Sequence, residues 1–367
     1  MDLHQIANRL LPGVSLRWRR LREKRQSHNS AFLQLPIELV IQIFEQLPPP
    51  NQALLAQSCR ALQSIFGGSC SQLSREQHLE YIVALARSIP RRWVCEVCVT
   101  LHEVVQLDTP HQPWHMSCLR GWDKWRTDAY GFLNCRVDRR NISIDHRHVQ
   151  LTLKYTRIQQ TRYQTYLQRL LTPYREVPFS TNMYIPPGLP SMLSARYSVY
   201  PKVVMDASDD LRYLVLSIWR FDQGVDGISV SLDNMGYLSI CPHLRIGPRE
   251  PCSWDPPLDR LGIAIATAFN CGYEVQGMCD RCPTDFSVKA TPWQAILQVW
   301  QDLGPEDSPV NMTWKAQKYD LRVGSGSMNH RLGGITLEHE PGSVRTLYET
   351  GSQEATVDSG GRLKLKR

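Results

Sequence analysis

The chain has 367 residues, of which 42% are hydrophobic and 21% are charged, a balance that excludes disordered and fibrous classes of protein. The net charge of +7 is concentrated near the two ends, in residues 17–25 and 364–367. There we expect solvated tails, with nuclear import or nucleic-acid contact as the alternatives. No apolar run reaches the roughly 20 residues that span a bilayer, and the N-terminus contains no signal-peptide core. We therefore expect an intracellular protein, in the cytoplasm or nucleus, that has no membrane partner.

The first half of the chain shows the spacing of helices. Apolar residues recur at intervals of three and four over residues 35–47, and the proline-rich segment 48–51 ends this first helix. A second helical pattern covers residues 52–66, and a third helix is expected over residues 74–87. A longer helix is expected over residues 149–171.

The second half shows the alternation of strands. Residues 200–205 and 211–219 flank a short acidic segment, so they predict a hairpin. A second pair is expected between residues 228–232 and 237–246. Further strands are expected at residues 273–276, 285–288 and 295–300, the last ambiguous between strand and helix.

The first helix carries more apolar surface than a small helical core can cover. Val40, Phe44 and Leu47 fall on one stripe of this helix, and Leu39 and Ile43 fall on an adjacent stripe. A surplus of this kind favours a docking helix with one stripe left for a partner. The alternative is an ordinary helical hairpin that is buried within its own domain.

The order of residues in this region resembles the F-box, most closely the version found in filamentous-fungal F-box proteins. Leu-Pro-x-Glu-Leu, Ile-Phe-x-x-Leu, a proline-rich turn, Leu-Leu and Cys-Arg-x-Leu follow one another between residues 33 and 66. One departure is that Asn51 and Gln52 stand where F-boxes usually carry an acidic residue. The resemblance implies binding to a Skp-type adaptor, which joins F-box proteins to a cullin scaffold. By the same resemblance, the residues that contact the adaptor or brace that face are Leu35, Pro36, Leu39, Ile43, Phe44, Leu47, Leu54, Leu55, Cys59 and Leu62.

Cysteines and histidines gather in a first cluster after the helical segment. Cys95 and Cys98 have the Cys-x-x-Cys spacing that lets two thiolates bind one zinc ion from a tight turn. The alternatives are reduced cysteines in a core and, less favoured, a redox pair. The candidate ligands are Cys95, Cys98, Cys118 and Cys135, and His102, His111 or His115 could replace one of them.

A second cluster lies in the strand region. Cys279 and Cys282 again form a Cys-x-x-Cys pair between two predicted strands. Cys241 and His243 are alternate residues at the end of a strand, so their side chains share one face. The candidate zinc ligands are Cys241, His243, Cys279 and Cys282, with Cys252 or Cys271 as possible substitutes. Zinc is therefore a possible cofactor, and none is certain from the sequence.

The motifs of common enzymes are missing from the sequence. It contains no Gly-x-Ser-x-Gly elbow, no His-Glu-x-x-His and no glycine-rich phosphate loop. We therefore expect no enzymatic activity. We expect a substrate-recognition subunit of a cullin-based SCF ubiquitin ligase, which binds a protein target and uses no nucleic acid. The alternative is a zinc-binding, nucleic-acid-associated or regulatory interaction protein that acts outside ubiquitination.

The predicted fold class is α+β, with an N-terminal three-helix F-box followed by a mixed helical and antiparallel β module. The sequence predicts five segments. They are a basic flexible segment (1–30), the F-box (31–75), a helical region with the first cluster (76–190), an antiparallel β-rich region with the second cluster (191–320), and a C-terminal extension (321–367) that is flexible from about residue 351.

Overall fold

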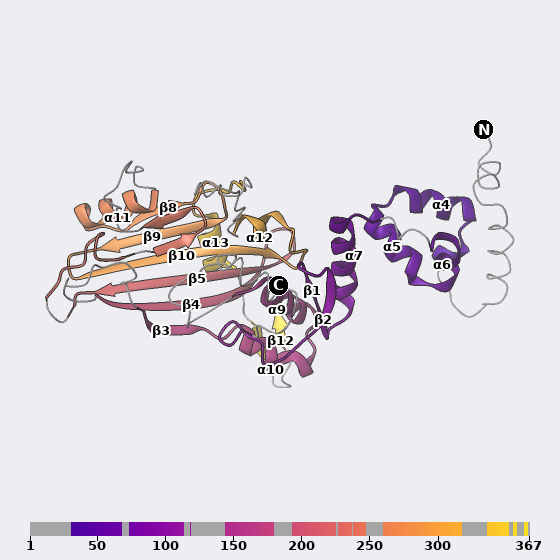
Figure 1. Ribbon diagram of the computed structural model, residues 1–367, viewed down its shortest axis with the longest axis horizontal. Coiled ribbons are helices and arrows are strands. Elements are labelled where there is room, and N and C mark those ends of the chain that lie inside the picture. The colour runs from indigo at the N-terminus through magenta and orange to yellow at the C-terminus, as the bar shows by residue number, and fades with distance from the viewer. Residues whose placement is uncertain are drawn as a thin grey trace, which may run out of the picture. The chain divides into compact units, whose positions relative to one another are not determined.

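The computed structural model is shown in Figure 1. It describes residues 31–67, 73–113, 118, 144–179, 193–224, 227–236, 238–246, 260–317, 336–351, 355–357 and 363–365. The expectations for the basic segment 1–30 and for the last two residues lie outside this part of the chain. The described residues divide into two compact units, one extending to Ile89 and including Val99–Leu101, and the other containing Pro90–Cys98 and the residues from His102 onward.

The first unit is helical (Figure 1). Its core contains Val40, Phe44, Ala56, Leu62 and Phe66, and the rings of Phe44 and Phe66 stack with centroids 3.8 Å apart. Its helices are α3 (Ala31–Gln34), α4 (Ile37–Gln46), α5 (Pro49–Ser58), α6 (Arg60–Phe66) and α7 (Arg75–Ser88).

The second helical pattern is wrong as one continuous helix, because the chain breaks into α5 and α6. Cys59 is the break, with an extended backbone at φ −153° and ψ 160°. The start was also misplaced, since α5 begins at Pro49 and not at Gln52. Proline is tolerated in a first helical turn because its missing amide would have no partner there.

The third predicted helix is confirmed as α7. Ser74 begins it with a capping box, in which the Ser74 hydroxyl accepts from the Gln77 amide and the Gln77 side chain accepts from the Ser74 amide. The Tyr81 hydroxyl donates to the Gln57 side chain, which joins α7 to α5. The helical unit therefore extends to about residue 89.

The second unit is built on a six-stranded antiparallel sheet in the order β3-β4-β5-β10-β9-β8 (Figure 1). Alternate residues of β5 face the main core, and Trp219 lies between Tyr197 of β4 and Leu297 of β10 in the register. The strands are β3 (Tyr174–Phe179), β4 (Ser194–Met205), β5 (Leu211–Asp222), β8 (Val275–Met278), β9 (Thr284–Ala290) and β10 (Gln294–Pro305).

Helices pack on this sheet. Val149 of α9 (His146–Ile158) and Leu261 of α11 (Arg260–Cys271) contribute to the main core. The short α12 (Met312–Ala316) contacts β10. The helix α13 (Ser343–Thr350) contacts β9 and β10. None of the helices in the described part of the chain is both long and apolar enough to cross a membrane.

The long helix expected over residues 149–171 is wrong as a single element. It forms α9 and α10 (Thr161–Leu170), which are separated at Gln159. Gln159 adopts the left-handed conformation (φ 53°, ψ 28°), which ends α9. The two helices enclose a smaller core with Trp93, Tyr155 and Tyr166.

The hairpin of β4 and β5 is confirmed, and both strands are longer than the sequence predicted. The strands at 273–276, 285–288 and 295–300 correspond to β8, β9 and β10, and the last is a strand throughout. The pairing of residues 228–232 with 237–246 is wrong. Instead, β6 (Leu238–Cys241) pairs with β7 (Leu244–Ile246), because the chain turns at Pro242 and His243.

Among the elements that were not predicted are two small sheets and one helix. The strands β1 (Arg92–Cys95) and β2 (Thr100–Glu103) form a two-stranded sheet. Where the sequence suggests a flexible end, β11 (Ala355–Val357) pairs with β12 (Leu363–Leu365). The helix α13 lies within the predicted C-terminal extension.

Candidate functional site

One stripe of α4 carries apolar side chains that its own unit leaves exposed. Leu39 is 44% exposed and Ile43 is 39% exposed, and they are one helical turn apart. Val40 and Phe44 lie on the adjacent stripe and are buried in the core of the unit. Pro36 is exposed just before the first turn of α4. The helix therefore has one side for its own core and one side that is open.

The other residues predicted to bind an adaptor differ in exposure. Phe44 and Leu62 are buried in the core, so a partner cannot touch them without opening the unit. These two side chains pack in the core that holds α4 in position. Five more residues are half-buried, namely Leu35, Leu47, Leu54, Leu55 and Cys59. Of these, Leu35, Leu55 and Cys59 pack against the core.

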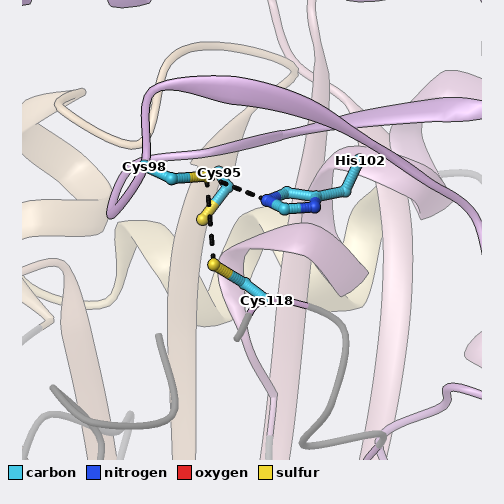
Figure 2. A group of neighbouring side chains, drawn as sticks. All are labelled: Cys95, Cys98, His102 and Cys118. Carbon is cyan, nitrogen blue, oxygen red and sulfur yellow. Dashed lines mark hydrogen bonds between the residues drawn. The ribbon is translucent and has the colours of Figure 1, made fainter. Parts of the chain in front are cut away.

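The first cysteine–histidine cluster forms at the β1–β2 hairpin (Figure 2). Cys95 is the last residue of β1, Cys98 lies in the turn, and His102 lies in β2. Cys118 comes to the same place from further along the chain, and its sulfur points at the others. The four ligand atoms lie within 4.8 Å of one another.

The distances inside this cluster are short. The sulfur of Cys98 lies 2.9 Å from Nε2 of His102 and 3.9 Å from the sulfur of Cys118. The ring of His102 stacks on that of Trp93, with centroids 4.9 Å apart, which fixes the direction of the imidazole. The arrangement places three sulfurs and one imidazole nitrogen around a common centre.

Burial dominates the electrostatics here. It raises the pKa of Cys95 to about 12, although the amides of Cys98 and Val97 donate toward its sulfur and oppose this shift. Burial also lowers the pKa of His102, as does the charge of Arg92. A neutral imidazole is the form that binds a metal ion.

The helix α9 holds β1 in place through polar side chains. The Gln150 amide donates to the carbonyl of Val94 and accepts from the amide of the same residue. One turn later, Lys154 donates to the Arg92 carbonyl at 2.6 Å, and burial lowers the pKa of this lysine to about 8. Tyr155 donates to the carbonyl of Pro90. These bonds fix the strand that carries Cys95.

The second cluster forms where two turns meet. Cys241 ends β6, and His243 lies in the turn before β7. Cys279 directly follows β8, and Cys282 lies in the turn before β9. The turn between β8 and β9 is closed by the amide of Cys279, which donates to the carbonyl of Thr284. Again, all four ligand atoms lie within 4.8 Å of one another.

The second cluster is more deeply buried than the first. The sulfur of Cys279 lies 3.5 Å from Nδ1 of His243 and accepts from the amide of Arg281 at 3.4 Å. Hydrogen bonds with Cys241 and Cys282 hold the pKa of Cys279 well below its usual range, whereas burial raises the pKa of both of those thiols.

A glycine makes room for the core beside this cluster. Gly277 of β8 lies opposite Phe286 of β9 in the register. A side chain at Gly277 would overlap the ring of Phe286. The close approach of this ring fixes the pairing that leads into Cys279.

The four residues predicted for the second cluster are brought together, whereas the first cluster is assembled differently. His102, which the sequence offered only as a substitute, completes that group, and Cys135 lies outside the described residues. His111 is directed instead toward the carbonyl of Thr172. Cys271 is exposed and its sulfur contacts nearby backbone. His115 and Cys252 also lie outside the described part of the chain.

The signal for His102 was its distance from Cys98. The two residues are four positions apart, which lets a tight turn return the second strand beside the first. The choice among three histidines depended on the β1–β2 pairing, which the sequence did not predict.

Comparison with known protein families gives a match to one part of the chain. The F-box domain family matches residues 32–74, which include α4, α5 and α6. Neither the curated proteins nor the solved structures contain a significant match to this chain. F-box domains bind Skp-type adaptors within SCF ubiquitin ligases. The match and the helical core of α4 to α6 together identify residues 32–74 as an F-box domain.

Proposed function

We propose that this chain is a substrate receptor of an SCF-type ubiquitin ligase, in which α4 docks on the Skp-type adaptor and the sheet unit binds a target protein. The observation that carries the proposal is the exposed apolar stripe of α4 within a matched F-box domain. In this role the chain tethers a target near the conjugating machinery and raises its effective concentration there. It performs no covalent chemistry itself.

The exposed stripe has the character of a docking surface. Leu39 and Ile43 face the same side of α4, and the buried residues behind them hold the helix in one position. A preformed surface binds more tightly because little conformational entropy is lost on association. Burying two partly exposed aliphatic side chains contributes about 1 kcal/mol each, by comparison with about 2 kcal/mol for a fully exposed one.

The departure at residues 51 and 52 has a structural counterpart. The Gln52 side chain donates to the Leu47 carbonyl at 2.9 Å and so closes the turn between α4 and α5. Asn51 is exposed in the first turn of α5. Docking of this F-box therefore relies on apolar contact and turn geometry, without an acidic side chain at that place.

Tryptophans in the second half of the chain are candidates for target contact, and those that the structure describes differ in exposure. Trp219 and Trp300 are buried in the sheet unit, and Trp254 lies outside the described residues. Trp293 is 66% exposed at the turn between β9 and β10. Exposed tryptophan is enriched at the centres of protein interfaces, so Trp293 is our candidate for target contact.

The experiment is an adaptor-binding measurement with the full chain and its Leu39→Ala/Ile43→Ala variant. We expect the double variant to bind a recombinant Skp-type adaptor about 10- to 100-fold more weakly, which corresponds to about 1.4 to 2.7 kcal/mol. Both side chains lie at the surface, so the thermal unfolding of the variant should stay close to that of the wild type.

The matched control is Ile263→Ala, which shortens an exposed isoleucine of α11 in the other unit. It should leave adaptor affinity unchanged. Equal adaptor affinity of the wild type and a folded double variant would contradict the proposal. Affinity purification of the wild type and the double variant then distinguishes two kinds of partner. The variant should lose scaffold proteins and retain target proteins.

A further inference from the structure

We propose that the chain binds two structural zinc ions, one held by Cys95, Cys98, His102 and Cys118 and the other by Cys241, His243, Cys279 and Cys282. This inference does not depend on the proposed role in a ubiquitin ligase. Both sets come from the sheet unit, and each has three thiols and one imidazole. This donor set is one that zinc takes in closed structural sites.

Two of the three distances given above agree with a tetrahedron, and the third, 2.9 Å between the sulfur of Cys98 and Nε2 of His102, is shorter. With Zn–S bonds of about 2.3 Å and Zn–N bonds of about 2.0 Å, two sulfurs lie about 3.8 Å apart, and a sulfur and a nitrogen about 3.5 Å apart. The sulfurs of Cys98 and Cys118 are 3.9 Å apart. The sulfur of Cys279 and Nδ1 of His243 are 3.5 Å apart. In each set, all four atoms lie within 4.8 Å of one another, as four ligands of one ion must.

Disulfide bonds fit the two clusters less well. A disulfide joins two sulfurs at about 2.05 Å. It would use two of the four side chains in each cluster and would not explain why the third thiol and the histidine lie beside them. All three cysteines of each cluster carry free thiols in this structure. A zinc ion uses every donor of the set.

Both sites are built on hairpin turns with hydrogen bonds aimed at sulfur. The amides of Val97 and Cys98 donate toward Cys95, and the amide of Arg281 donates to Cys279 at 3.4 Å. Bonds of this kind share the negative charge of a thiolate and orient it toward a metal ion. Both clusters therefore share one feature, a hairpin turn whose backbone amides donate toward a cysteine sulfur.

The two sites would stabilise different parts of the unit. The first zinc ion would hold the β1–β2 hairpin against Cys118. The regular structure of that hairpin is a short two-stranded sheet. The second joins the β6–β7 turn to the β8–β9 turn, and so ties a separate hairpin to the edge of the six-stranded sheet. With four protein ligands each, neither site has an open position for catalysis.

The first test is the metal content of the full chain, purified without chelator and measured by elemental mass spectrometry. We expect about two zinc ions per chain. Native mass spectrometry should show the same mass increment on the folded protein. A zinc content near zero, iron in place of zinc, or disulfides between the six thiols would overturn the proposal.

The second test assigns the ligands. His102→Ala and Cys279→Ser should each reduce the zinc content to about one ion per chain, because each removes a ligand from one closed site. Cys135→Ser and Cys271→Ser are the matched controls and should retain both ions. Loss of a zinc ion in Cys135→Ser with none lost in His102→Ala would overturn the ligand set of the first site.

Conservative replacement keeps the test valid if a ligand variant does not fold. His102→Cys and His243→Cys restore four ligands to each site and should keep both ions, where the alanine variants lose one. Titration of the wild-type chain with a mercurial reagent gives an independent readout. Zinc release should follow the modification of three thiols per ion, and release without thiol modification would contradict thiolate ligation.

Discussion

At the scale of single residues, Asp108 is the most constrained charge of the sheet unit. Its carboxylate accepts from Nε of Arg147 at 2.6 Å and from Nε2 of His148 at 3.1 Å. The amide of Asp145 donates to Nδ1 of the same histidine, so the proton of the neutral ring lies on Nε2, where Asp108 accepts it. Despite burial, these two partners hold the pKa of Asp108 well below its usual range.

Replacement of this carboxylate should destabilise the unit. Asp108→Asn removes the charge opposite Arg147 and weakens the bond to the fully buried His148. Breaking one side of a buried charge pair costs about 3 to 5 kcal/mol, and the lower end applies because Asp145 still pairs with Arg147. Urea unfolding at neutral pH measures the loss, and Asp233→Asn, at an exposed carboxylate, is the control.

The same residue predicts a dependence on pH. Because the folded pKa of Asp108 is lowered, its contribution is complete above the unfolded value near 4 and is lost as the pH falls toward the folded value. The stability difference between wild type and Asp108→Asn should therefore be largest above about pH 5 and shrink in acid. A difference that grows below pH 4 would contradict this assignment.

At the scale of elements, Asp285 fixes the C-terminal helix α13 to the sheet. It lies in β9, and its carboxylate accepts from the amides of Gly342 and Arg345 at the start of that helix. His339 also approaches it at 3.1 Å. The guanidinium of the same Arg345 lies 4.7 Å from the ring centroid of Trp300. One carboxylate thus satisfies amides that the helix itself leaves without partners.

Loss of this contact should release α13 before the rest of the unit unfolds. Asp285→Asn lowers the charge at the helix start and should cost about 1 to 2 kcal/mol, as for other cap removals. Limited proteolysis followed by mass spectrometry should show faster cleavage within residues 336–351. Glu340→Gln, at an exposed side chain, should leave the cleavage rate unchanged. Equal rates in the Asp285 variant and wild type would contradict a pinning role.

The elements that could be predicted are those with a local signal. The periodicity of α4, the capping residues of α7 and the acidic turn of the β4–β5 hairpin all lie within short windows of sequence. The breaks at Cys59 and Gln159 could not be predicted, because neither residue is a strong helix breaker and tertiary packing selects its conformation. The ligand set predicted for the first cluster differs from the assembled group for the same reason, because the pairing of β1 with β2 brings His102 to the cysteines.

At the scale of the whole molecule, the two compact units have cores of different kinds. The F-box core is made by helices adjacent in sequence, whereas the main core of the sheet unit joins strands and helices from residues 144 to 337. The division at about residue 89 places α7 with the F-box helices. The boundary predicted from the sequence, after residue 75, places α7 in the following region instead. Capping and amphipathic spacing predict a helix but not the unit that it joins.

This division predicts two separable unfolding transitions in scanning calorimetry. Saturation with adaptor should raise the unfolding temperature of the helical unit only. At an adaptor concentration 100 times Kd, the free energy of unfolding of that unit should increase by about 2.7 kcal/mol. A zinc chelator should lower only the transition of the sheet unit, since both clusters belong to it. A single transition that shifts with both reagents would contradict independent units.

The centre of the large sheet has a consequence for the order of events during synthesis. Strands β5 and β10 pair directly, yet Asp222 and Gln294, which face each other at the start of that pairing, are 72 positions apart. Closing so long a loop is slow, because its entropy is lost before any contact compensates for it. The F-box helices pair with near neighbours in sequence, α4 with α5 and α5 with α6 and α7. A nascent chain therefore completes its F-box while the sheet still lacks its central strand, and in the proposed role the adaptor can bind before the sheet unit is able to hold a target.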